Sequence, residues 1–180
     1  DGVIGPGEYI APPLVTANDV TLYAMGDGEF LYMAAHWQDE TLNIDKSTWE
    51  YDGSTFVKGP GNEDRFSFVW DMGTNGADGA SCTTMCHGDG KMRTNNGFVD
   101  VWHWKAARGN GVGFADDKYW DTEDRQSDPG VKSYVDNAAD GKPLFMAATD
   151  PNTSVDFLAA DADALAGWDP FGTMAAHSVA

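Results

Sequence analysis

The sequence predicts a mainly β protein, an antiparallel β-sandwich with long functional loops and little helix, in one domain over residues 1–180. Three observations support this prediction. Short segments alternate apolar and polar residues at the period of a strand. The 21 glycines and 8 prolines cluster between those segments, where turns are expected. Helical periodicity is scarce, and regularly punctuated short strands are typical of a sandwich.

The first predicted strands form a hairpin. Residues 20–25 and 29–37 are rich in strand-forming types, and Gly26-Asp27-Gly28 lies between them as a turn signal. Two further strands follow at residues 66–71 and 99–105, where apolar side chains alternate. In the second of these, we expect Val99, Val101, His103 and Lys105 to share one face, opposite Trp102 and Trp104.

The remaining segments lack this alternation. The stretch Cys82–Gly97 contains Gly, Asn and Cys, and a loop of that length in a compact domain is typically functional. Residues 106–142 are similarly predicted to be loop-like. An Ala-rich pattern over 155–166 predicts a short helix, and the last residues are predicted to be a tail.

Composition and charge exclude several classes of function. The chain has 180 residues, 42% hydrophobic and 22% charged, as expected of a globular protein. Lys plus Arg number 11 against 29 Asp plus Glu, so the formal net charge is -18. A field this negative argues against nucleic acids and anionic membrane surfaces as partners. The longest apolar run is only a few residues, so we expect no transmembrane segment.

The first residue is Asp1 and no apolar leader precedes the globular sequence. A mature exported chain has this form after its signal peptide is removed. We therefore expect an exported protein, periplasmic or extracellular.

The most informative pattern is Cys82-Thr83-Thr84-Met85-Cys86-His87, a C-x-x-x-C-H motif. Its logic follows the C-x-x-C-H haem-attachment signal, in which two thiols add to the haem vinyl groups and the adjoining His coordinates the iron. Two other interpretations remain open. The cysteines could close a short hairpin as a disulfide, or the motif could bind zinc, although a second Cys/His pair at suitable spacing is missing.

An electron-transfer haem with two axial ligands needs a second one besides His87, and His, Met and Lys are all chemically able. Met92 lies five residues after His87 in a polar loop, where a core role is awkward. His103, Lys132 and Lys105 are the alternatives. Trp102 is a candidate wall of the cofactor site, although aromatic residues in a sandwich fill the core first. The carboxylates of residues 116–124 match no calcium loop and are expected at turns.

Four elements in order carry a family resemblance: Leu31–Trp37, Asn62–Asp71, Cys82–Asp89 and Val99–Ala106. Over residues 15–150 they resemble the ethylbenzene dehydrogenase-related haem-binding domain, the γ-subunit type of cytochrome that accompanies molybdenum enzymes of the dimethyl sulfoxide reductase family. The resemblance implies a β-sandwich, an exported location and one haem for one-electron transfer. It also implies a b-type haem held by Met and Lys in the best-known members, and the Cys pair resembles a variant branch with covalent haem.

Together these observations predict a single-haem cytochrome, c-type more readily than b-type, with Cys82, Cys86 and His87 at the haem. It would not be an enzyme by itself. Its partner would be a redox protein, such as a molybdenum enzyme subunit or another cytochrome, and oligomers or polymers joined through sheet edges are compatible with the sequence. The alternative is a carbohydrate- or other ligand-binding β-sandwich module with a Cys82–Cys86 disulfide.

Overall fold

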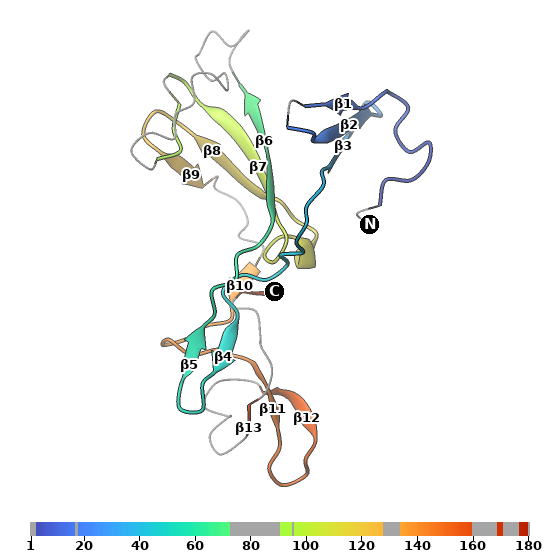
Figure 1. Cartoon of the computed structure of the whole chain (residues 1–180). Helices are drawn as coiled ribbons and strands as arrows, with labels where there is room; N and C mark the ends of the chain where they lie inside the picture. Colours follow the sequence, from blue (N-terminus) through green and yellow to red (C-terminus); the bar gives the residue numbers. More distant parts are fainter. Residues whose placement is uncertain are drawn as a thin grey trace. The chain divides into compact units, whose positions relative to one another are not determined.

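Strands are the main regular secondary structure in the computed structural model, which describes residues 3–16, 18–72, 91–94, 96–127, 134–159, 169–170 and 177–179 (Figure 1). The strands are β1 (Leu14–Val15), β2 (Thr21–Gly26), β3 (Leu31–His36), β4 (Trp49–Tyr51), β5 (Phe56–Lys58), β6 (Arg65–Asp71), β7 (Val99–Lys105), β8 (Asp116–Trp120), β9 (Arg125–Ser127), β10 (Tyr134–Asp136), β11 (Met146–Thr149), β12 (Asp156–Ala159), β13 (Asp169–Pro170) and β14 (His177–Val179). Within the described residues, the one helical element is the 3-10 turn η3 (Asn110–Val112).

The strand pairs in this part of the chain are antiparallel, so the predicted mainly β, antiparallel fold class is confirmed. The chain divides into two compact units, residues 1–42 and 43–180, and each is described by itself. The expectation of one domain stays a prediction.

The first unit contains the sheet β1–β2–β3. Its β2–β3 hairpin confirms the one predicted from the sequence, with Gly26 opposite Leu31. Asp27 closes the turn, because its Oδ1 accepts hydrogen bonds from the backbone N–H of Glu29 at 2.9 Å and of Phe30 at 2.7 Å. Gly28 has a φ of 95°, which a residue without a side chain adopts at no steric cost.

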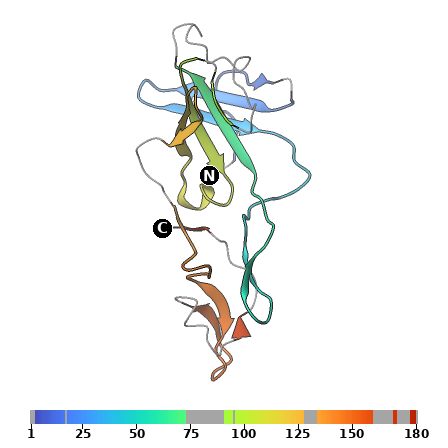
Figure 2. The ribbon, with the colours of Figure 1, turned by 90° about the vertical axis from the view of Figure 1, so that its left-hand side faces the viewer.

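The second unit contains the largest sheet, in the order β6–β7–β8–β9 (Figures 1 and 2). Alternation gives this sheet two different faces. On one face, Val99, Val101 and Trp120 are buried and form a core cluster with Val69. His103 and Lys105 continue along β7 on that same face, as predicted, while Trp102 and Trp104 belong to the other.

A buried carboxylate fixes the end of β7. The side chain of Glu63 is fully enclosed, and it accepts hydrogen bonds from Nε of Arg108 at 2.7 Å and from the backbone N–H of Ala107 and Arg108 at 3.0 Å each. The neighbouring Asp64 accepts the backbone N–H of Ala106 at 2.9 Å through its carbonyl. The segment before β6 is therefore held to the turn after β7.

A second core cluster of this unit is built from other short strands. Trp49 on β4 packs with Met146 and Ala148 on β11, and Phe56 and Ala138 contact them. The indole N–H of Trp49 donates to the carbonyl of Asn137 at 2.5 Å, while the side chain of Asn137 bonds both backbone groups of Phe145. Buried polar groups here have partners, as a stable core requires.

Three predictions of secondary structure are wrong in part. Residues 106–142 contain β8, β9 and β10. In β8, pairing with β7 outweighs the low strand propensity of Asp116 and Asp117. The predicted helix over 155–166 begins instead as β12, since the chain reverses at residues 150–155 and β12 pairs with β11. Residues 160–166 lie outside the description. The predicted tail includes β14, which pairs with β10.

Candidate functional site

The sequence-predicted haem residues divide into two groups. Cys82, Cys86, His87 and Lys132 lie outside the described residues. Met92, Trp102, His103 and Lys105 lie within them, so their positions can be compared with the surroundings of the predicted haem loop.

The described residues on either side of segment 73–90 meet one end of the β6–β9 sheet. Met72 directly follows β6. On the other side, Thr94 is buried and donates its backbone N–H to the carbonyl of Asp121 at 2.8 Å. Lys91 donates to the carbonyl of Glu123 at 3.4 Å, and the N–H of Met92 donates to Oδ1 of Asp124 at 3.4 Å. The second flank is thus bound to the turn between β8 and β9.

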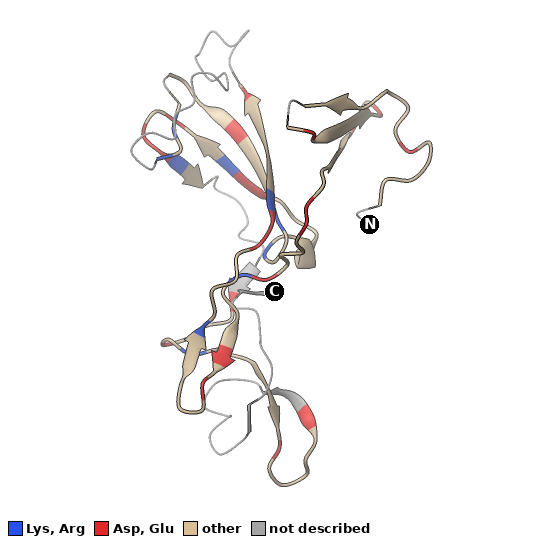
Figure 3. Cartoon of the chain, viewed as in Figure 1, with Lys and Arg blue, Asp and Glu red and all other residues tan. Residues whose placement is uncertain are grey.

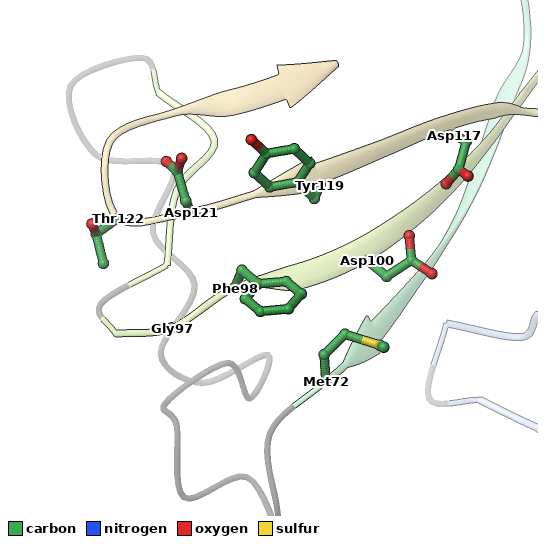
Figure 4. Close-up of a pocket in the computed structure, with 8 residues that line it drawn as sticks. All are labelled: Met72, Gly97, Phe98, Asp100, Asp117, Tyr119, Asp121 and Thr122. Atoms are coloured by element: carbon green, nitrogen blue, oxygen red, sulfur yellow. The ribbon is translucent and has the colours of Figure 1, made fainter. Parts of the chain in front are cut away.

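A groove of about 680 Å³ lies at this same end of the sheet (Figure 4). It is lined by Met72, Gly97, Phe98, Asp100, Asp117, Tyr119, Asp121 and Thr122. Phe98, which directly precedes β7, and Tyr119 of β8 meet edge to face, with ring centroids 6.5 Å apart (Figure 4). Its volume falls within the range typical of small-molecule and cofactor sites, which are mostly apolar with a few polar groups.

The groove opens on the aromatic face of the sheet. By register, this face carries Asp100 and Trp102 of β7, Asp117 and Tyr119 of β8, and the β6 aromatics Phe66, Phe68 and Trp70. Successive ring contacts join Phe66, Phe68, Trp70 and Trp102, with centroids 4.9, 5.8 and 5.2 Å apart. Trp102 is 37% exposed, so this row of rings ends at a partly accessible indole.

His103 lies on the opposite, core-facing side of β7. Burial lowers its pKa to about 4, and the charge of Lys105 adds to this effect. The ammonium of the buried Lys105 is bound to Asp116, which Lys118 also approaches at 3.8 Å. The register therefore separates His103 and Lys105 from the groove, and Lys105 already has an anionic partner.

Met92 flanks the predicted haem loop and is 37% exposed. It lies outside the groove lining, although its backbone is bound to the turn that contributes Asp121. Trp102 belongs to the groove side of β7, and its indole N–H donates to Oδ2 of Asp100 at 3.0 Å.

Two residues that the sequence reasoning missed lie on the groove side. Met72 lines the groove and carries a thioether. Trp70 holds a buried indole N–H that has no hydrogen-bond acceptor among the described residues, a situation that costs about 1–3 kcal/mol. The alternation of β6 was the signal that could have found both, since it places residues 70 and 72 on one face.

Lys, Arg, Asp and Glu positions are distributed over the described strands and turns (Figure 3). The groove lining contains three aspartates and no cationic residue. The described residues contain no cluster of three or more His, Cys, Asp or Glu side chains able to hold a metal ion. In the same part of the chain, no helix is long and apolar enough to cross a membrane.

Comparison with known proteins places the chain in a family. No curated protein and no solved structure matches it. Residues 9–175, however, match the family described as ethylbenzene dehydrogenase. The match covers nearly the whole sequence, including the residues that line the groove. The chain therefore belongs to the ethylbenzene dehydrogenase family.

Proposed function

We propose that this chain carries electrons one at a time through a single haem bound in the groove at the end of the β6–β9 sheet. The observation that carries the proposal is that the groove is lined by residues next to the predicted haem loop. Met72, Gly97 and Phe98 belong to the two flanks of the loop that contains Cys82, Cys86 and His87. The family is one of haem-binding cytochrome domains, which supports the haem itself.

Chain length supports the placement of the haem. His87 precedes Lys91 by four residues, and four residues span at most about 14 Å. Lys91 is bound to the carbonyl of Glu123, beside the groove residues Asp121 and Thr122. This chain length is compatible with a haem in the groove that His87 binds.

The haem is proposed to be c-type, attached through Cys82 and Cys86, with His87 as one axial ligand. The second ligand is a methionine sulfur, for which Met72 in the groove lining ranks ahead of Met92. His103 and Lys132 remain the alternatives, although His103 lies on the other face of β7. When bound, the haem supplies reversible one-electron chemistry, and a sulfur ligand raises its potential.

The residues around the groove have separate tasks. Phe98 and Tyr119 present ring faces and edges that exclude water from a bound macrocycle. Trp102 extends the aromatic wall along β7. The carboxylates of Asp100, Asp117 and Asp121 place negative charge beside the site, which favours the oxidised, more positive state of an iron centre.

The proposed location is outside the cytoplasm, periplasmic or extracellular, where the chain exchanges electrons with a redox protein. The family supports a role as a non-catalytic subunit of a redox enzyme complex. A molybdenum enzyme subunit or another cytochrome is the proposed partner.

Intact-mass spectrometry and visible absorption of the purified protein test this proposal. Expression in a host that matures c-type cytochromes is expected to give a Soret band and a denatured mass increased by about one haem. Cys82→Ala with Cys86→Ala removes the covalent mass, and His87→Ala alters the absorption spectrum. His36→Ala on β3 is the matched control and leaves both unchanged. A colourless protein whose mass has decreased by two hydrogens contradicts the proposal.

The second candidate function is binding of a carbohydrate or another ring-shaped ligand. It is favoured by the aromatic face of β6 and β7, where the ring contacts of Phe68, Trp70 and Trp102 end at a solvent-exposed indole. In this alternative Cys82 and Cys86 form a disulfide. The same mass and absorption measurements separate the two functions.

A further inference from the structure

The outer edge of β3 in the first unit has no strand beside it. The sheet order is β1–β2–β3, so β2 pairs with one edge of β3, and no strand in the described part of the chain pairs with the other. Asp27 donates its backbone N–H to the carbonyl of Phe30 at 3.2 Å, which makes these two residues a hydrogen-bonded pair. Hydrogen-bonded pairs alternate along an antiparallel ladder, so the next residues of β3 that bond β2 are Tyr32, Ala34 and His36.

The residues between them direct their backbone N–H and C=O groups away from β2. These outward residues are Leu31, Met33 and Ala35. The other side of the hairpin shows the same alternation, because the N–H of Thr16 donates to the carbonyl of Val20 at 2.9 Å and Leu22 therefore bonds β1 rather than β3. The free edge of β3 is thus a row of backbone donors and acceptors, which is a template for another strand.

β3 has none of the features that protect edge strands. Its six residues, Leu31–His36, include no Lys, Arg, Asp, Glu, Pro or Gly. The side chains of Leu31 and Tyr32 are 53% and 42% exposed. Natural edge strands are commonly short or charged, and other edges of this chain follow that rule. β1 has two residues, and β9 has three and begins with Arg125.

The charge of the chain indicates what kind of strand can lie against this edge. The net charge is -18, so two copies of the chain repel one another over most of their surfaces. Because β3 contains no charged residue, two copies can approach along it without setting carboxylates of this strand against each other. A basic strand would be attracted by the net charge but would find no carboxylate on β3 to bind. An uncharged strand is therefore the neighbour that this edge fits.

We propose that β3 pairs antiparallel with β3 of a second copy of this chain, across a two-fold axis at Met33. In this register Met33 lies opposite Met33 of the second copy, and Leu31 lies opposite Ala35 of the second copy. The outward residues then all occupy hydrogen-bonded pairs, and each pair exchanges two N–H···O=C bonds. The result is one continuous sheet in the order β1–β2–β3–β3–β2–β1.

The same register brings apolar side chains together. One face of the hairpin sheet is apolar in its own right, since by register it carries Leu14, Leu22, Ala24, Leu31, Met33 and Ala35. Pairing through β3 would extend this face across both copies. A two-fold contact uses the β3 edge of each chain, so assembly through it ends at a dimer. The inference goes beyond electron transfer and does not require haem.

Amide hydrogen exchange of the full chain, followed by nuclear magnetic resonance, tests this pairing residue by residue. The amides of Tyr32, Ala34 and His36 bond β2, so they are expected to exchange slowly at every protein concentration. The amides of the outward residues are expected to exchange about 10-fold more slowly, or better, at high concentration than after dilution. Fast exchange of the outward amides at every concentration overturns the inference. Slow exchange in a monomeric protein also overturns it, because the chain itself would then cover the edge.

Sedimentation equilibrium gives the second readout. The wild type is expected to approach twice the mass of one chain at high concentration. Met33→Lys sets two lysines face to face on the two-fold axis and is expected to raise the dissociation constant of the dimer about 10-fold or more. Val57→Lys on β5 is the matched control, because Val57 is a strand residue that is 39% exposed and lies outside β3. A monomeric wild type, or equal effects of the two variants, overturns the inference.

Discussion

Nε of Arg108 lies 2.7 Å from a carboxylate oxygen of Glu63, whose side chain is fully enclosed. The two residues are 45 positions apart, and they connect the segment before β6 to the turn after β7. Both belong to or adjoin sequence elements that carry the family resemblance. Their role in this structure is to hold the sheet that forms the groove, and no atom of either residue lines the groove itself.

Replacing Glu63 with Gln is expected to destabilise the second unit strongly. The change leaves the guanidinium of Arg108 beside a neutral amide, and breaking a buried ion pair costs about 3 kcal/mol or more. Urea unfolding monitored by tryptophan fluorescence measures the loss. Arg65→Gln is the matched control, because Arg65 lies 3.5 Å from Glu63 with a side chain that is 36% exposed. Its expected cost is below about 1 kcal/mol. Equal costs would contradict this account.

Acidification is expected to remove part of the stabilisation that the Glu63–Arg108 ion pair provides. Burial raises the pKa of Glu63, but hydrogen bonds and charge from Arg108 more than offset this and leave the pKa below its usual value. Its stabilisation is therefore complete above the unfolded value of about 4.3 and is lost as the pH falls through the lower folded value. Melting temperatures between pH 7 and pH 3 test this. The difference between wild type and Glu63→Gln should shrink at the acidic end.

His103 is expected to create a second, separate acid transition. Its folded pKa of about 4 lies below the ordinary 6.5, chiefly because of burial. The unfolded chain takes up the proton first, so stability is full above pH 6.5 and falls as the pH drops toward 4. His103→Gln should flatten the stability profile in this window, by about 1–2 kcal/mol after allowance for solvent screening. A proton resonance of His103 that titrates near 6.5 would disagree with the structure.

Substitution of the two methionines is expected to identify the second haem ligand. Met72→Leu preserves the apolar groove lining but removes the sulfur, so it should lower the reduction potential and abolish the weak far-red band of iron–sulfur ligation. Met92→Leu is the paired variant and should leave both unchanged. Redox titration followed by visible absorption measures the two effects. The reverse pattern would assign Met92, and an effect of neither would exclude methionine.

Electron exchange with a cationic partner is expected to slow as salt rises. The net charge of -18 and the carboxylates around the groove attract a positive acceptor, and ionic strength screens that attraction over about 10 Å at 0.1 M. Stopped-flow oxidation by a cationic cobalt complex and by an anionic iron complex provides the comparison. Rates should fall with salt for the first and rise for the second. Rates independent of salt for both would contradict electrostatic steering.

Much of the second unit could be predicted from local alternation. The strands at 66–71 and 99–105 and the division of β7 into a His103 side and a Trp102 side follow from a period of two residues. β8 and β12 could not be predicted in this way. Asp116 and Asp117 have low strand propensity. β12 forms by pairing with β11 across a short turn, and this pairing is not contained in the propensity of residues 156–159 themselves.

The candidate site was harder to predict than the sheet. The C-x-x-x-C-H motif predicts a haem loop from its chemistry alone, and this stays a prediction because the motif lies outside the described residues. The prediction that Trp102 lies on the face of β7 opposite His103 is confirmed. Trp70 was interpreted only as a strand residue, and Met72, just beyond the predicted strand 66–71, was given no role. Their relation to the site depends on the register between β6 and β7, which sets Trp70 against Asp100.

The two-sided character of β7 has a consequence for sequence change in this family. A one-residue insertion or deletion in the middle of β7 would move every later side chain to the opposite face of the sheet. His103 and Lys105 would then face the groove, and Trp102 and Trp104 would face the core. Such a length change would damage folding and the proposed haem binding together. Point substitutions are therefore expected to be tolerated along this strand far better than length variation, which should be confined to the turns at its two ends.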